Sequence, residues 1–197
     1  MKNYFLLIIS LFLFSCKKST PASEPVPVYQ PVSNPAYVQF TISAGGHYCD
    51  KNALTPVSIS EMNFKVRFDS SAIYQTTDPQ NQYDINKLYG FSEGHDHHQN
   101  SARIGWSWND TALRLYAYTY KNGLRDSKEI TMVSIGADIN CGIKVSGNAY
   151  IFKAGNTTVT MPRAFNDPLA NGYKLYPYFG GDEVAPADIR ILIQELP

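Results

Sequence analysis

A cluster of histidines is the part of the chain best suited to metal or acid–base chemistry. His95, His97 and His98 are three of the four histidines, and a single aspartate separates the first from the other two. Neutral imidazole is a good ligand for Zn²⁺ and Cu²⁺. A metal site would need a further, distant ligand, such as His47 or Glu93. We therefore expect a polar, solvated loop, with a metal site or a catalytic histidine as the alternatives.

Alternating tyrosines and arginines form a second candidate site. Arg114, Tyr116, Tyr118 and Tyr120 occupy every second position, so in a β-strand they share one face, and Arg103 belongs to the neighbouring strand. Tyrosine offers a flat apolar ring with a hydroxyl, and arginine offers a forked donor for carboxylates or hydroxyls. A sugar has apolar faces and polar rims, so this surface suits a glycan. The alternative is that the tyrosines only cover the sheet, because tyrosine is a good strand former.

Carboxylates near the C-terminus form a third candidate. Asp182 and Glu183 follow a Gly-Gly turn, and Asp188 precedes the last apolar segment. Carboxylates and free carbonyl groups can hold Ca²⁺. Because the spacing matches no defined calcium loop, the sequence favours solvated turn residues over a calcium site.

A predicted β-hairpin over residues 101–120 positions the tyrosines and arginines. The Asn-Asp pair at 109–110 is a turn signal between two runs of alternating apolar residues. A two-residue loop there would place Trp106 opposite Leu113. The pairs on that face are all apolar, so that face is core and the other displays the tyrosines and arginines.

Short alternating segments continue through the rest of the chain. They are clearest over residues 37–43, 62–68, 129–137, 149–153 and 188–196. About ten such segments, separated by turn signals and almost without helical periodicity, favour an all-β fold. Residues 70–99 are less regular, with a short helical turn expected over 85–89. We predict an antiparallel, jelly-roll-like β-sandwich whose first and last strands pair, with a closed β-barrel as the alternative.

Charge and length limit the classes of function. The chain has 197 residues, and its 17 lysines and arginines balance 17 acidic residues. A nucleic-acid-binding domain would carry a basic field, so we expect no nucleic-acid partner. The length suits one domain, which we place over residues 37–197 and expect to be a monomer.

The N-terminus has the features of a secreted lipoprotein. Lys2 precedes an apolar run over residues 4–14 that is too short to span a bilayer. The run ends in LFSC, which resembles the lipobox of bacterial lipoproteins, although Phe14 is bulkier than the usual residue. The resemblance implies that residues 1–15 are a signal peptide and that lipidated Cys16 anchors the protein to a membrane. The expected location is the cell envelope, at the outer membrane, on its periplasmic or surface side. The alternative is an ordinary secretory signal.

A proline-rich segment connects this anchor to the predicted domain. Residues 16–36 contain five prolines among serine, valine and glutamate. Such a composition favours extended polyproline II structure and cannot bury a core. We expect this segment to be a stalk.

Two cysteines, Cys49 and Cys141, remain in the predicted domain. An even pair in an oxidising compartment favours a disulfide, worth ~4–5 kcal/mol for a loop of this length. The alternative is two buried free thiols.

The C-terminal segment carries a second resemblance. The ending APADIRILIQEL is similar to the last strand of concanavalin-A-like and related jelly-roll domains in carbohydrate-active proteins. The resemblance implies a role with glycans and makes Asp188 a candidate ligand of a structural Ca²⁺, the only cofactor considered. The Glu-x-Asp-x-x-Glu strand of the glycosidase branch is absent, and the Arg/His/Tyr motifs of the lyase branch are not recognisable.

We therefore expect a non-catalytic module that binds a glycan or a similar polar ligand. The alternatives are a polysaccharide lyase or hydrolase on the same scaffold, and a structural or assembly lipoprotein that binds another protein. A deep groove lined by His98, Arg103 and tyrosines would favour an enzyme. A shallow aromatic platform would favour a binding module.

Overall fold

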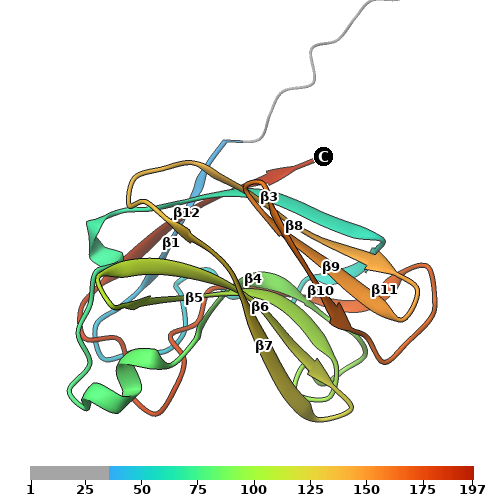
Figure 1. Ribbon diagram of the computed structural model, residues 1–197, viewed down its shortest axis with the longest axis horizontal. Coiled ribbons are helices and arrows are strands. Elements are labelled where there is room, and N and C mark those ends of the chain that lie inside the picture. The colour runs from blue at the N-terminus through green and yellow to red at the C-terminus, as the bar shows by residue number, and fades with distance from the viewer. Residues whose placement is uncertain (1–35) are drawn as a thin grey trace, which may run out of the picture. The chain divides into compact units, whose positions relative to one another are not determined.

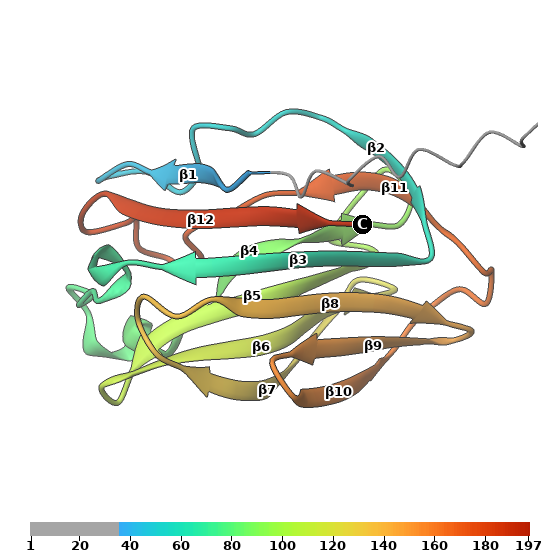
Figure 2. The same ribbon diagram turned by 90° about the horizontal axis from the view of Figure 1, so that it is seen from above.

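The computed structural model describes residues 36–197, which form two antiparallel β-sheets packed face to face (Figure 1). Each sheet has six strands, in the orders β1-β12-β3-β8-β9-β10 and β2-β11-β4-β5-β6-β7. This arrangement confirms the predicted β-sandwich, and the closed-barrel alternative is wrong. The predicted pairing of the first and last strands is also confirmed, because β1 lies beside β12 (Figure 2).

The strands of the first sheet are β1 (Val38–Ile42), β3 (Glu61–Phe68), β8 (Ile139–Ser146), β9 (Ala149–Ala154), β10 (Thr157–Pro162) and β12 (Ile189–Leu196). Those of the second sheet are β2 (Pro56–Ile59), β4 (Asn86–Ser92), β5 (Ser101–Asn109), β6 (Ala112–Lys121), β7 (Leu124–Val133) and β11 (Ala170–Leu175). Two short 3₁₀ helices, η1 (Ser70–Ala72) and η2 (Pro79–Tyr83), precede β4.

The core lies between the sheets and is rich in aromatic side chains. Trp106 of β5 is fully buried, with ring-centroid distances of 5.3 Å to Phe68 of β3 and 5.7 Å to Tyr74. Phe64 of β3 meets Tyr89 of β4 edge to face at 5.2 Å. Such pairs contribute roughly 0.5–1.5 kcal/mol beyond their buried area, so these contacts hold the two sheets together.

The β5–β6 hairpin confirms the predicted faces and corrects the predicted register. The turn residues are Asp110 and Thr111, with φ angles of 46° and 61°, so the turn lies one residue later than expected. Trp106 consequently faces Leu115 rather than Leu113. The pairing differs by two residues, and side chains alternate with a period of two. The apolar residues therefore stay on the core face.

Strand β4 replaces the irregular segment and the helical turn that the sequence predicted around residues 85–89. Its register with β5 shifts between Lys87 and Tyr89, and the adjacent residues Leu88 and Tyr89 are both buried, so apolar and polar positions do not alternate. Gly90 lies against the backbone of β5, where an added Cβ would collide with Ala102 and Arg103. The segment is therefore a central strand, although it lacks the period of an exposed one.

The predicted disulfide is absent, because Cys49 and Cys141 are both free, buried thiols. The backbone of Cys49 pairs with that of Ile42 of β1 in an isolated β-bridge, whereas Cys141 lies on β8. Strands β12 and β3 lie between β1 and β8. At about 4.8 Å per strand the two cysteines are more than about 14 Å apart, beyond the ~7 Å limit for bridged Cα atoms. Burial raises the pKa of the Cys141 thiol to about 12, so it stays protonated.

No helix within residues 36–197 is long and apolar enough to cross a membrane. The predicted signal peptide, the lipidation at Cys16 and nearly all of the predicted stalk lie outside the described residues.

Candidate ligand-binding groove

A groove of about 460 Å³ lies over the outer face of the second sheet. Side chains from β4, β5, β6, β7 and β11 line it, together with three loops. Its charged and aromatic residues are Lys87, Arg103, Arg125, Lys174, His97, His98, Tyr48, Tyr118, Tyr120, Tyr173, Tyr176 and Tyr178. No described lining residue carries a carboxylate, although Lys174 pairs with Glu195 at 2.6 Å, so the positive charge of the groove comes from Lys87, Arg103 and Arg125.

Arg103 is the most deeply placed of these cations, with 6% of its surface exposed. Within residues 36–197 it has no ion-pair partner, and its Nε atom lacks any hydrogen-bond acceptor. Burial lowers the pKa of Arg103, although an arginine stays charged at neutral pH. An uncompensated buried charge costs several kcal/mol. A negative group beside Arg103 would compensate this charge.

Lys87 of β4 is a second largely buried cation. Its Nζ atom lies 5.0 Å from the ring centroid of Tyr118 and 5.8 Å from that of Tyr178, so the ammonium group interacts with two aromatic rings. Burial, and then the charges of Arg103 and Arg125, lower the pKa of Lys87 to about 8. At neutral pH Lys87 still carries its charge.

His97 and His98 lie at the rim of the groove, in the loop between β4 and β5. His97 Nδ1 shares a hydrogen bond of 2.8 Å with the hydroxyl of Tyr173, and the two imidazole rings lie 4.1 Å apart. Burial, and then the charge of Arg103, lower the pKa of His97 to about 4. His97 is therefore neutral at pH 7 and is oriented by Tyr173.

The other metal ligands that the sequence suggested do not join this loop. His47 Nδ1 contacts the carbonyl of Phe179 at 2.8 Å, and Glu93 belongs to a buried ion pair. In the described part of the chain, the one group of three ligating residues is Asp96, His97 and His98, with ligand atoms within 4.8 Å of one another; exposed His95 is not in it. The absence of a metal site stays a prediction.

A buried ion pair anchors the loop that carries the histidines. The Glu93 carboxylate accepts hydrogen bonds from Arg163 Nε at 2.6 Å and from the hydroxyl of Tyr150 at 2.5 Å. The Arg163 guanidinium also donates to the carbonyls of Gly147 and Leu169. Because Glu93 directly follows β4, this network fixes the point from which the histidine loop leaves the sheet.

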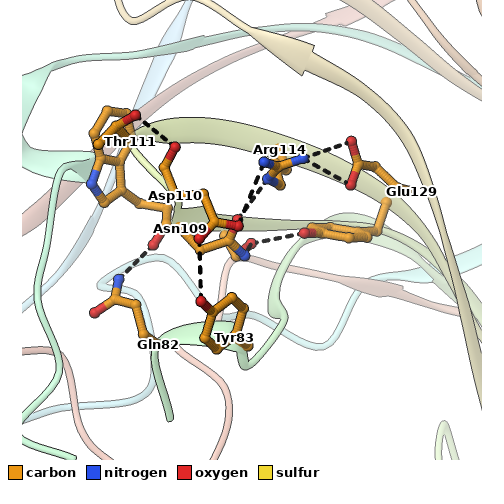
Figure 3. Close-up of polar contacts among 10 residues, drawn as sticks. Gln82, Tyr83, Asn109, Asp110, Thr111, Arg114 and Glu129 are labelled. Atoms are coloured by element: carbon orange, nitrogen blue, oxygen red, sulfur yellow. Dashed lines mark hydrogen bonds and ion pairs between the residues drawn. The ribbon is translucent and has the colours of Figure 1, made fainter. Parts of the chain in front are cut away.

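Arg114 and Tyr116 share the face of Arg103 but do not line the groove. Arg114 Nε donates to Asn109 at 2.6 Å, and its terminal nitrogen lies 3.2 Å from the Glu129 carboxylate (Figure 3). The Tyr116 hydroxyl lies 3.1 Å from Ser107 Oγ. Both predicted site residues are thus held in a separate polar cluster near the β5–β6 turn.

The C-terminal carboxylates accept hydrogen bonds from backbone groups. Glu183 accepts from the N–H groups of Thr77 and Asp78, and Asp188 accepts from that of Ala44 at 2.9 Å. These contacts tie loops together. Calcium binding by Asp188 stays a prediction.

The structure thus brings together three of the five tyrosine and arginine residues that the sequence selected: Arg103, Tyr118 and Tyr120. It adds Lys87, Arg125 and Tyr178, which sequence reasoning missed. Lys87 lies on the strand that was predicted as irregular, and the other two come from an exposed edge strand and a loop. No periodicity could have selected them.

No protein-family model matches this chain, and no curated protein matches it. Solved structures resemble its fold at low sequence identity. Alginate lyase AlyC3 has a TM-score of 0.54 at 10% identity, covering 82% of this chain and 74% of that one. Its complex with dimannuronate has a TM-score of 0.51 at 10% identity, covering 82% and 76%. The carbohydrate-binding module CBM66 from Bacillus subtilis reaches 0.36 at 8% identity, covering 82% and 94%. The AlyC3 likeness shows a shared β-sandwich fold.

Proposed function

We propose that this chain is a lipid-anchored, monomeric envelope protein whose groove binds an acidic glycan such as a polyuronate. The observation that carries this proposal is that buried Arg103 has no carboxylate partner within residues 36–197 and that no described residue lining the groove carries a carboxylate. A uronate carboxylate would supply the missing acceptors through a forked, charge-assisted contact. The neighbouring tyrosines offer rings on which sugar faces stack. The likeness to AlyC3 makes mannuronate oligomers reasonable first ligands to test.

A second candidate function is β-elimination of the same ligand, and a specific arrangement favours it. His98, Arg103 and several tyrosines line the groove, the residues that we expected in an enzyme, and neutral His97 pairs with Tyr173 beside Arg103. In such a reaction Arg103 would neutralise the uronate carboxylate, and a base would remove the proton from C5. The bond from C4 to the leaving oxygen then breaks, that oxygen takes up a proton, and a C4–C5 double bond forms.

Replacing Arg103 with glutamine tests the proposal. The loss of a charge-assisted contact is expected to weaken binding of oligomannuronate about 10- to 100-fold, measured by isothermal titration calorimetry. The melting temperature should hold or rise, because the variant removes an uncompensated buried charge. Ultraviolet absorbance of the same mixtures reports any double bond and decides between binding and elimination.

Arg114→Gln is the matched control, because Arg114 lies on the same face outside the groove. It should leave the affinity unchanged. Equal affinity of wild type and Arg103→Gln, or equal binding of a neutral glucan, would refute an acidic glycan as the ligand.

Binding is also expected to depend on pH through Lys87. The folded protein holds the pKa of Lys87 at about 8, and Arg103, Arg125 and Asp84 are its charged neighbours. Below that pH the ammonium attracts an anionic ligand, and above it this attraction is lost as the proton leaves. A bound anion stabilises the ammonium group and so raises the pKa of Lys87. The affinity for the anion should therefore fall about tenfold as the pH rises above about 8. Calorimetry on Lys87→Met should show an affinity that does not change with pH in this range. If the affinity of the variant falls with pH as steeply as that of the wild type, the role of Lys87 is contradicted.

Lipidation at Cys16 is proposed from the LFSC segment. Cys16→Ser is expected to release the protein from the membrane fraction and to abolish labelling with a fatty-acid analogue, because the acyl chains supply the membrane affinity. Cys49→Ser is the matched control, since Cys49 is buried within the domain and should not alter partitioning. A Cys16→Ser protein that still carries label would rule out this anchor.

A further inference from the structure

A second, smaller hollow of about 120 Å³ adjoins the groove. Four residues line both spaces: Lys87, Tyr118, Arg125 and Gly181. The hollow therefore begins where the groove ends, with Lys87 and Tyr118 at the junction.

The strand register gives the direction of this continuation. Along β6, Tyr120 lines the groove only and Tyr118 lines both spaces. On β7, Arg125 is opposite Tyr120, and Ser127, which lines the hollow only, is opposite Tyr118. The two spaces thus follow one another along the β6–β7 pair, toward η2.

The chemistry of the hollow differs from that of the groove. Tyr83, Asp84 and Ser127 line it alongside the shared cations. Asp84 brings a carboxylate to this space, and carboxylates accept hydrogen bonds from sugar hydroxyls. Ser127 both donates and accepts. Such a mixture suits the hydroxyl groups of a sugar ring. Arg125 also lines the hollow and could contact the carboxylate of a uronate bound there.

We infer that the groove and the hollow are consecutive subsites for one acidic glycan chain, so that the ligand is a polymer bound along its length rather than a single sugar or a chain end. This inference rests on the proposed binding of an acidic glycan in the groove. It adds a second sugar position, formed by Tyr83, Asp84 and Ser127, and predicts that affinity increases with chain length.

Calorimetry with dimannuronate and hexamannuronate tests the inference in the full domain. The hexamer is expected to bind wild-type protein about tenfold more tightly than the dimer, because additional sugars reach the hollow. Ser127 lines the hollow and not the groove, so Ser127→Trp should remove most of this advantage and change the dimer affinity by no more than about twofold. The matched control is Ser58→Trp on exposed β2, which lines neither space and should preserve the advantage. Thermal melts confirm that both variants fold.

The outcomes separate this inference from the proposed function. If both oligomers bind equally, the groove binds an acidic glycan and the second subsite is refuted. If the hexamer binds more tightly but Ser127→Trp keeps the difference, the extra sugars lie elsewhere and the inference is again overturned. If neither oligomer binds while Ser127→Trp and wild type fold alike, the proposed mannuronate ligand and the inference both fail.

Discussion

Glu93→Ala is expected to lower the free energy of unfolding by about 3–5 kcal/mol, because it leaves the buried Arg163 guanidinium without its counter-ion. Arg163 is 2% exposed and Glu93 5%, so water cannot replace the lost carboxylate. The Tyr150 hydroxyl loses its acceptor at the same time. Chemical denaturation followed by tryptophan fluorescence measures the change, since both tryptophans lie in the domain.

Glu129→Ala is the matched control for this substitution. Glu129 pairs with Arg114 at 3.2 Å near the surface, where a lost ion pair costs about 0–1 kcal/mol. A loss at Glu93 no larger than that at Glu129 would show that the buried network does not stabilise the domain. If the network fixes the histidine loop, milder Glu93→Gln should also weaken ligand binding while the domain remains folded.

Trp106→Ala is expected to destabilise the domain by about 3–5 kcal/mol. The indole is fully buried between the sheets, against Phe68 and Tyr74, and alanine would leave a cavity that surrounding strands cannot close. Urea denaturation gives the change in the free energy of unfolding. The contact with Phe68 crosses from one sheet to the other, so its loss weakens the packing on which the sandwich depends.

Trp108→Ala, two residues along the same strand, is the matched control. Trp108 points to the same side but is only partly buried at the end of the hairpin, so it should lose clearly less stability. Equal losses at the two positions would contradict the central role of Trp106 in the core.

The sequence was sufficient to predict the sandwich, because most strands bury one face and therefore alternate. In β5 and β6 this alternation identified the core residues and the faces correctly even though the turn was placed one residue early. Strand β4 was missed because its apolar residues do not alternate. Its register with β5 shifts between Lys87 and Tyr89, and the adjacent residues Leu88 and Tyr89 are both buried.

The candidate site was predictable only where it follows one strand. Tyr118 and Tyr120 were selected by their spacing, and Arg103 by the hairpin that pairs it with Tyr118. Lys87 and Tyr178 enter the site through the exchange of backbone hydrogen bonds between distant segments. The disulfide between Cys49 and Cys141 was predicted wrongly for a similar reason. The number of cysteines and the expected compartment suggested it, but the order of the strands in the sheet keeps the two residues apart.

The two buried free cysteines make it possible to measure how often the folded domain opens. No disulfide joins residues within 36–197, so the folded domain should tolerate reducing conditions. We expect that it can be expressed in a reducing cytosol. Cys141 is 3% exposed on a central strand, and an alkylating reagent can reach it only when the sheets separate. The rate of modification at Cys141, measured in a variant that lacks Cys16, therefore reports how often the sheet opens around this residue.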